Sequence, residues 1–218
     1  MAASLLNMSC CGRCWGRLTI PVFLIPGNHD RRENLKAVFS DYPGMQQNEQ
    51  YVQYSVDCGP IRLVALDTVV PEQHHGALRP EQLDWLATEL ARDPQRPTII
   101  FMHHPPFACG IQHMDQIRLL EGADTLAHII RQNPQVERLL RGHHHRPIHM
   151  RWAGTIASTG PSVAHQVQLD LLPGTAGALV LEPPAYQLHG YIEHTGLITH
   201  TAYVERFAGP YPFLSDLD

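Results

Sequence analysis

The chain has 218 residues, of which 44% are hydrophobic and 17% are charged, and its net charge is −5 with histidine counted as neutral. This balance is typical of a globular protein with a buried core and argues against disorder. The acidic net charge argues against a nucleic acid polymer as partner, because binding a phosphate backbone requires a basic surface. The unusual feature is histidine, which occurs 15 times and is the commonest protein ligand of transition metals.

The five cysteines are odd in number and irregularly spaced, which does not suggest a disulfide framework. Cys11-Gly12-Arg13-Cys14 has the spacing of a redox motif or of half a zinc site, but no second pair completes it. No apolar run is long enough to span a bilayer, and the first residues lack the pattern of a signal peptide. We therefore expect a cytoplasmic protein without membrane contact.

Three short apolar segments are predicted to be buried strands, and each ends in a loop that contains histidine. They lie at residues 18–25, 97–102 and 136–140. Apolar spacing predicts helices over residues 31–40, 80–92 and 125–131. The other predicted strands lie at residues 51–56, 61–67, 155–160, 167–171, 185–192 and 197–204, and the first two and the last two are expected to pair as hairpins.

The three histidine-bearing loops are expected to converge, because sheets with helical crossovers present their ligands at the carboxyl ends of strands. The first is Pro26-Gly27-Asn28-His29-Asp30, the second is Met102-His103-His104-Pro105-Pro106, and the third is Arg141-Gly142-His143-His144-His145. On an extended third loop, His143 and His145 would point to the same side. In the second loop His103 is the expected ligand, while its neighbour packs or approaches a substrate.

In this order, the three blocks resemble the last three signature blocks of the calcineurin-like metallophosphoesterases. Leu66-Asp67-Thr68 and the segment 76–85 are similar to the branch that contains class III cyclic nucleotide phosphodiesterases and related glycerophosphodiesterases. The resemblance implies an α/β (α+β) fold, a four-layer sandwich of two β-sheets flanked by helices. We predict a metallophosphoesterase domain over residues 18–172, partial because the chain lacks earlier motifs. An atypical segment precedes it at 1–17, and a C-terminal β-hairpin extension follows at 173–218.

The resemblance also implies a two-metal centre. Asn28, His103 and His143 are the implied ligands of the second metal, and His145 is an implied ligand of the first. The metals would bind the phosphate oxygens of the substrate and lower the pKa of a bridging water that attacks phosphorus. Nitrogen and oxygen ligands admit iron, manganese, zinc or cobalt. The implied substrate is a small phosphodiester, either a cyclic nucleotide or a glycerophosphodiester.

Two further catalytic roles are carried over from the family. His29 is implied to contact the phosphate and assist the leaving group. Asp30 is implied to orient His29 by a hydrogen bond. From the residues alone, the Gly27-Asn28-His29-Asp30 stretch is also a good turn, so its assignment depends on the other two loops.

The sequence departs from the family before Asp30. The family opens with Asp-x-His and Gly-Asp-x-x-Asp blocks, but no Asp precedes Asp30 and no His precedes His29. Without a bridging carboxylate two adjacent dications repel strongly. We therefore expect an N-terminally truncated chain that binds at most one metal well and hydrolyses its substrate poorly or not at all. A catalytically impaired metal-binding remnant and a phosphomonoesterase remain alternatives, whereas the absence of paired thiolates disfavours a structural zinc protein.

Histidines outside the three blocks have other interpretations. His74-His75 is interpreted as a solvated loop, with substrate contact as the alternative. His189, His194 and His200 fall in the last predicted hairpin and are interpreted as surface or interface residues. The sequence leaves the oligomeric state open; in a homodimer, this hairpin would extend the contact surface.

Overall fold

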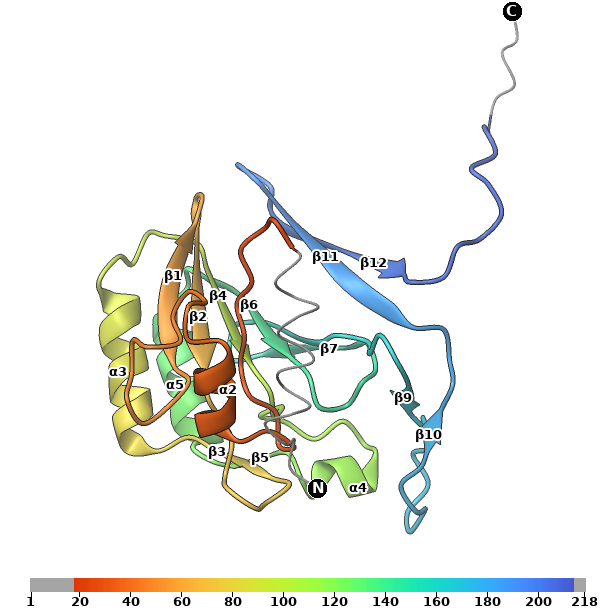
Figure 1. The fold of residues 1–218 in the computed structure, drawn as a ribbon, viewed down its shortest axis with the longest axis horizontal. Coiled ribbons are helices and arrows are strands. Elements are labelled where there is room, and N and C mark those ends of the chain that lie inside the picture. The colour runs from red at the N-terminus through yellow and green to blue at the C-terminus, as the bar shows by residue number, and fades with distance from the viewer. Residues whose placement is uncertain (1–17, 214–218) are drawn as a thin grey trace, which may run out of the picture.

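The computed structural model describes residues 18–213, and its centre is a six-stranded mixed sheet with the order β1-β2-β4-β6-β8-β7 (Figure 1). β2, β4, β6 and β8 run parallel, and β1 and β7 close the two edges in antiparallel pairing. The strands are β1 (Tyr54–Cys58), β2 (Ile61–Leu66), β4 (Thr98–Met102), β6 (Val136–Arg141), β7 (Ile148–Trp152) and β8 (Thr155–Thr159).

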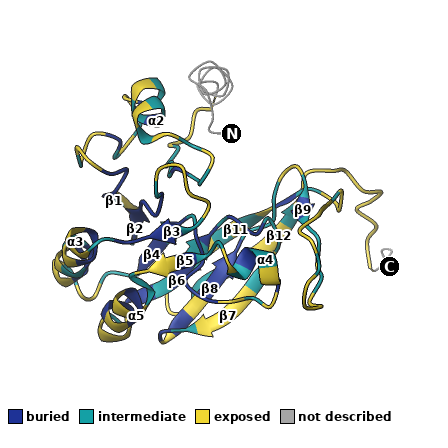
Figure 2. Ribbon diagram, turned by 90° about the horizontal axis from the view of Figure 1, so that it is seen from below, coloured by how far each residue is buried: buried dark blue, intermediate teal, exposed yellow. Residues whose placement is uncertain are grey.

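Two helices, α3 (Pro80–Ala91) and α5 (Ala123–Gln132), cover one face of this sheet. Every second residue of the central strands points toward them, and these positions are buried (Figure 2). The resulting core joins Val64, Ile100 and Leu139 of the sheet to the apolar stripes of both helices. This burial explains why the strands read as nearly continuous apolar runs.

The opposite face is covered by less regular structure. Near β1 and β2, the helix α2 (Arg32–Val38) builds a second core with Leu35, Tyr54 and Ala65. Over β6, the cover is the antiparallel hairpin of β11 (Ala185–Ile192) and β12 (Gly196–Tyr203). The remaining elements are short: β3 (Gly76–Ala77), α4 (Gln112–Asp115), β5 (Leu119–Glu121), β9 (Gln166–Val167) and β10 (Leu179–Val180).

The predicted α/β class is confirmed, since a central sheet is flanked by helices. The second sheet of the expected sandwich is, within residues 18–213, the hairpin of β11 and β12. Both predicted hairpins form, and all three predicted helices are present with slightly shifted ends. The predicted domain division near residue 172 stays a prediction. The described helices include none that is both long and apolar enough to cross a membrane.

The predicted strand at residues 18–25 is wrong. In the described part of the chain no strand pairs with this segment, and Pro21 and Pro26 lack the N–H that a ladder requires. Its apolar character instead reflects packing, because Phe23, Leu24 and Ile25 lie against the second core. The hydroxyl of Tyr54 donates a hydrogen bond of 2.7 Å to the Leu24 carbonyl.

Two other predictions need smaller corrections. Only the first residue of the predicted strand at 167–171 is extended in a ladder, where Val167 pairs with Leu179. β7 was not predicted, although Ile148, Met150 and Trp152 alternate with polar residues as in a half-exposed edge strand.

A buried carboxylate ties α2 to the end of β2. The fully buried Asp67 accepts two hydrogen bonds from the Arg32 guanidinium, at 2.5 and 3.0 Å. It also accepts the backbone N–H groups of Val52 at 3.0 Å and Val69 at 2.9 Å. Arg32 donates further to the Val69 carbonyl and lies over the Tyr51 ring. The charge of Asp67 is thus fully paired, and the helix that follows Asn28-His29-Asp30 is fixed to the sheet.

Replacing Asp67 by alanine should lower the free energy of unfolding by about 3–5 kcal/mol, because the Arg32 guanidinium is left without its buried partner. Urea denaturation followed by circular dichroism measures this. The control is Asp57→Ala, which removes a carboxylate that is 64% exposed and 3.1 Å from Arg96, and should cost less than about 1 kcal/mol. Equal effects of the two variants would contradict the role given to Asp67.

Candidate metal centre

Strand register brings the second and third histidine loops together. β4 and β6 are parallel, with Met102 opposite Arg141. The next residues, His103 and Gly142, therefore leave the sheet side by side at its carboxyl edge. The Cβ that a side chain at Gly142 would carry lies 3.3 Å from His103 Nδ1, a tight contact that would press on the His103 ring, so glycine favours the close approach of the two loops.

Three ligand-type atoms meet at this edge. His103 Nε2 lies 2.9 Å from Asn28 Oδ1 and 3.1 Å from His143 Nδ1. The first loop reaches the site because Gly27 passes directly over the His103 ring, where an added Cβ would lie 2.9 Å from Cε1. One pocket of about 550 Å³ is lined by all six residues predicted from the sequence. These are Asn28, His29, Asp30, His103, His143 and His145.

The chemistry of these atoms fits a cation. His103 Nε2 faces the amide oxygen of Asn28, which accepts only, and a ring nitrogen of His143. If Nε2 carries a hydrogen, that hydrogen can point well at only one of these two atoms; if it does not, its lone pair faces that of the Asn28 oxygen. In addition, the buried Nε2 of His143 has no hydrogen-bond partner. A metal bound by the three side chains would use the lone pairs that the protein leaves opposed.

His104 and His144 have structural roles beside the centre. The ligand atoms of His103, His104 and His143 all lie within 4.8 Å of one another. Both ring nitrogens of His104 are nevertheless used, by Thr68 Oγ1 at 2.8 Å and by the His74 carbonyl at 3.1 Å. We therefore exclude His104 from the ligand set. His144 turns away from the pocket, and its Nε2 lies 3.7 Å from the sulfur of Cys109.

The third loop is not extended as predicted. His143 and His145 have φ values of 71° and 54°, in the left-handed region that residues other than glycine seldom adopt. Both side chains still line the pocket. Such backbone strain persists only where the surroundings enforce it, and it concentrates at functional sites.

Burial keeps the imidazoles of the centre neutral. Loss of solvent lowers the pKa of His143 to about 4, and those of His104 and His144 to about 3. The pKa of His103 falls well below its ordinary value, first through burial and then through the neighbouring imidazoles. At neutral pH these rings present lone pairs, the state in which imidazole binds a metal.

The implied roles of Asp30 and His145 stay predictions, and the two side chains make the following contacts. The Asp30 carboxylate accepts the Gly27 N–H at 2.8 Å, which stabilises the turn, and within residues 18–213 no hydrogen bond joins it to His29. His145 lies with its ring 4.8 Å from that of His165, and its buried Nδ1 has no hydrogen-bond partner.

Two histidines that line the pocket were not predicted as site residues. His74 stands on an exposed loop, as interpreted, yet its Nδ1 lies 3.3 Å from Asn28 Nδ2 and its side chain lines the pocket. His165 also lines the pocket. No motif surrounds it, and only the hydrogen bonds between its loop and the third histidine loop reveal its place. These join Ser162 N–H to the His145 carbonyl and Arg146 to the Val167 carbonyl.

The family model of the calcineurin-like phosphoesterases matches residues 4–147. The chain belongs to this family. It is 40% identical over 199 residues to a probable glycerophosphodiester phosphodiesterase, GpdQ, of Arcobacter nitrofigilis, covering 91% of this chain and 72% of that protein. It is 34% identical over 192 residues to a probable cyclic nucleotide phosphodiesterase, RPA0124, of Rhodopseudomonas palustris, covering 84% of this chain and 66% of that protein.

Solved structures agree on the fold. A dimetal phosphatase from Danio rerio superposes with a TM-score of 0.55 at 17% identity, covering 92% of this chain and 76% of that one. The protein TT1561 of Thermus thermophilus superposes with a TM-score of 0.50 at 15% identity, covering 83% of this chain and 80% of that one. At these identities the likeness concerns the fold alone. The histidine cluster is consistent with the divalent metals of the family.

Acid should destabilise the metal-free protein well above the range in which carboxylates titrate. Unfolded histidine binds a proton near pH 6.5, whereas folded His104, His143 and His144 do so only at about 3, 4 and 3. With His103 included, the free energy of unfolding should be at its maximum above pH 6.5. Below that pH it should fall by up to about 5 kcal/mol for each unit by which the pH decreases. Urea denaturation between pH 7.5 and 5 measures the slope. His144→Gln should reduce it by about a quarter, and a flat profile would contradict these pKa values.

Alanine at Gly27 should weaken metal binding without unfolding the protein, because its Cβ pushes the His103 ring from its position. We expect about a 10–100-fold loss of affinity, the range for residues that orient a metal ligand. Cobalt titration followed by visible absorption measures it. Gly190→Ala is the control, since its Cβ meets nothing within 4 Å. Unchanged cobalt affinity in Gly27→Ala would show that His103 is not a ligand.

Proposed function

We propose that this chain is a metal-dependent phosphodiesterase that hydrolyses a small phosphodiester. The observation that carries the proposal is the meeting of Asn28 Oδ1, His103 Nε2 and His143 Nδ1 in one pocket. The relatives named as glycerophosphodiester and cyclic nucleotide phosphodiesterases support it. The proposed metals are iron, manganese, zinc or cobalt, because the donors are nitrogen and oxygen. We also propose that the protein acts in the cytoplasm, because the odd number and irregular spacing of its cysteines do not suggest the disulfides that are typical of secreted proteins.

Asn28, His103 and His143 would hold a divalent metal, with His145 beside them, and the bound ion would supply Lewis acidity and an acidified water. The protein's own contribution is to keep these imidazoles neutral and fixed. His29 is exposed at the pocket wall, where its ring can donate a proton to the oxygen of the departing alcohol. The pairing of Asp30 with Gly27 holds the backbone that carries His29.

A second pocket of about 390 Å³ adjoins the centre and shares Asn28, His29, Asp30 and His74 with it. Its other polar lining consists of Arg31, Arg32, Glu33, Glu72 and Gln73. Among the described residues that line either pocket there is no Phe, Tyr or Trp, but bases also stack on His and Arg side chains, and both are present. The lining therefore does not separate the two predicted substrate classes. The 40% identity to a probable glycerophosphodiester phosphodiesterase, against 34% to a probable cyclic nucleotide phosphodiesterase, supports the glycerophosphodiesters.

Turnover of model substrates tests the proposal. The wild-type chain loaded with manganese, cobalt, zinc or iron should hydrolyse bis(4-nitrophenyl) phosphate faster than 4-nitrophenyl phosphate, and glycerophosphocholine faster than cyclic AMP. His103→Ala should lose metal and activity together. His29→Ala should keep its metal and lose about 10²–10⁴ in kcat. His194→Ala is the control, because this side chain is 91% exposed at the hairpin turn. Preference for the monoester would favour the phosphomonoesterase alternative.

One observation favours a second candidate, a metal-binding protein with impaired turnover. Within the described residues Asp30 is the only carboxylate that lines the central pocket, and it is bonded to Gly27. Two dications without an anion between them repel. Metal analysis of the purified chain separates the candidates. Two tightly held ions with turnover would refute the impaired form, whereas one ion without turnover would support it.

A further inference from the structure

The central pocket has an apolar wall that the candidate metal centre does not use. Two of its side chains, Met114 and Ile117, follow the second histidine loop, and two more, Val167 and Leu179, are a cross-strand pair of β9 and β10. These four residues are called the apolar wall. The metal-ligating atoms belong to Asn28 and the histidines, so the apolar wall is available for another part of a bound substrate.

The other side of the centre is polar. The central pocket and the adjoining pocket of about 390 Å³ share Asn28, His29, Asp30 and His74, and most of the remaining lining of the adjoining pocket is charged or polar. The centre therefore lies between a polar side and the apolar wall. A phosphodiester carries two alcohol groups on one phosphate, so this arrangement suits a substrate with one polar and one apolar group.

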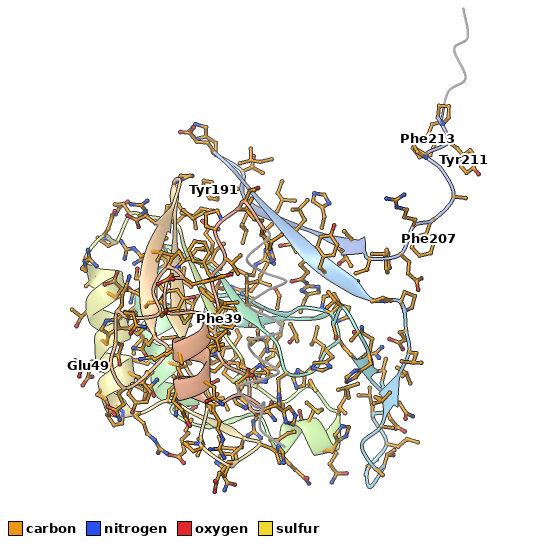
Figure 3. All side chains as sticks on the ribbon, viewed as in Figure 1. Phe39, Glu49, Tyr191, Phe207, Tyr211 and Phe213 are labelled. Atoms are coloured by element: carbon orange, nitrogen blue, oxygen red, sulfur yellow. The ribbon has the colours of Figure 1, made fainter. Side chains whose placement is uncertain are left out.

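Exposed leucines follow the apolar wall in the sequence. Each lies within five residues of Val167 or Leu179 and is 60–85% exposed: Leu169, Leu171, Leu172 and Leu181. Figures 1 and 3 show the connection between β9 and β10 on the side of the molecule where α4 lies, and in Figure 3 its side chains stand away from the packed body. Exposed apolar side chains that gather beside a pocket indicate a binding surface.

Polar contacts fix this leucine-rich segment to the body. The Gly174 N–H donates to Gln112 Oε1 of α4 at 2.6 Å. Arg146 donates to the Val167 carbonyl at 2.7 Å and pairs with Glu182 at 2.9 Å. Because the backbone is held at both ends and at its turn, the exposure of the leucines is a property of the fold.

We propose that the apolar wall binds a hydrocarbon chain, so that the substrates are single-chain glycerophospholipids. This inference rests on the proposed phosphodiesterase function and names the substrate class of the same pocket. In such a lipid the phosphate joins an amino alcohol to a glycerol that carries one acyl chain. The acyl chain would lie on the apolar wall, and the amino alcohol would enter the polar side, where Glu33 and Glu72 suit a cationic amine.

Charge favours a dissolved lipid over a membrane surface. Residues 163–184 contain Asp170 and Glu182 but no Lys or Arg. Binding to an anionic bilayer relies on basic residues beside the apolar ones, and this segment has none. A lipid with one short chain can be taken from solution as a monomer, and its binding does not require a basic surface.

The arrangement also determines which bond would break. His29 lies on the polar side and has the proposed role of proton donor, so the departing group would be the amino alcohol. The oxygen of water bonds to phosphorus and releases a proton to solvent, while the bond from phosphorus to the amino alcohol oxygen breaks. That oxygen keeps the electron pair and takes the proton of His29. The products are an acylglycerol phosphate and a free amino alcohol.

Isothermal titration calorimetry of the manganese-loaded full chain tests the proposal by binding of the expected product, which requires no turnover. Below its micelle concentration, 1-decanoyl-glycerol 3-phosphate should bind at least about 30-fold more tightly than glycerol 3-phosphate, because each buried CH₂ contributes up to about fourfold. Leu179→Gln should weaken this binding about 10-fold, and its side chain is 59% exposed, so the fold should be retained. The matched control is Leu120→Gln, on β5 and 47% exposed, which should bind as the wild type does.

The proposal is overturned if the decanoyl compound binds no more tightly than glycerol 3-phosphate, or if Leu179→Gln and Leu120→Gln bind it equally well. Cosedimentation of the wild type with phosphatidylcholine–phosphatidylglycerol vesicles, lost in Leu179→Gln, would assign the leucines to a membrane surface. A dimer in sedimentation velocity that Leu179→Gln dissociates would assign them to a second copy of the chain, and either result refutes the lipid site. Absent hydrolysis of bis(4-nitrophenyl) phosphate would instead contradict the proposed function and leave the binding result unchanged.

Discussion

The register between β4 and β6 is the constraint on which the candidate centre depends. With Met102 opposite Arg141, the two histidine loops leave the sheet at neighbouring points. A shift of one residue would move every side chain of β6 to the other face of the sheet. That shift would expose Leu139, which is buried in the core under α3 and α5. The hydrophobic burial of this core therefore fixes the geometry of a polar site at its rim.

The parts of the structure that were predictable from the sequence are those governed by local patterns. Apolar periodicity gave α3 and β4, and strand ends followed by histidine placed His103 and His143 in one pocket. The segment at residues 18–25 failed because apolar composition reports burial and not strand pairing, and its side chains are indeed packed. His165 could not be found because its position depends on contacts between loops that are distant in sequence.

β6 connects the two faces of the molecule. Leu139 points into the core beneath the helices, whereas its neighbour Arg138 points to the hairpin and bonds Thr199 and Ser158. Burial lowers the pKa of Arg138, and its Nε has no hydrogen-bond partner. Burying this cation therefore opposes folding. Its hydrogen bonds to hydroxyl groups of β8 and β12 attach the hairpin to the sheet, and each contributes about 0.5–1.5 kcal/mol net.

The same reasoning applies to the centre itself. His103, His104, His143 and His144 are removed from water with their pKa values lowered, and the buried guanidinium of Arg141 lies against Phe107 with no hydrogen-bond partner. Opposed lone pairs and desolvated cations both oppose folding. The paired Asp67 shows that this chain can neutralise a buried charge where structure alone requires it. The unsatisfied donor atoms of Asn28, His103 and His143 are therefore better explained by a bound cation than by stability, because a metal would satisfy them and couple its binding to folding.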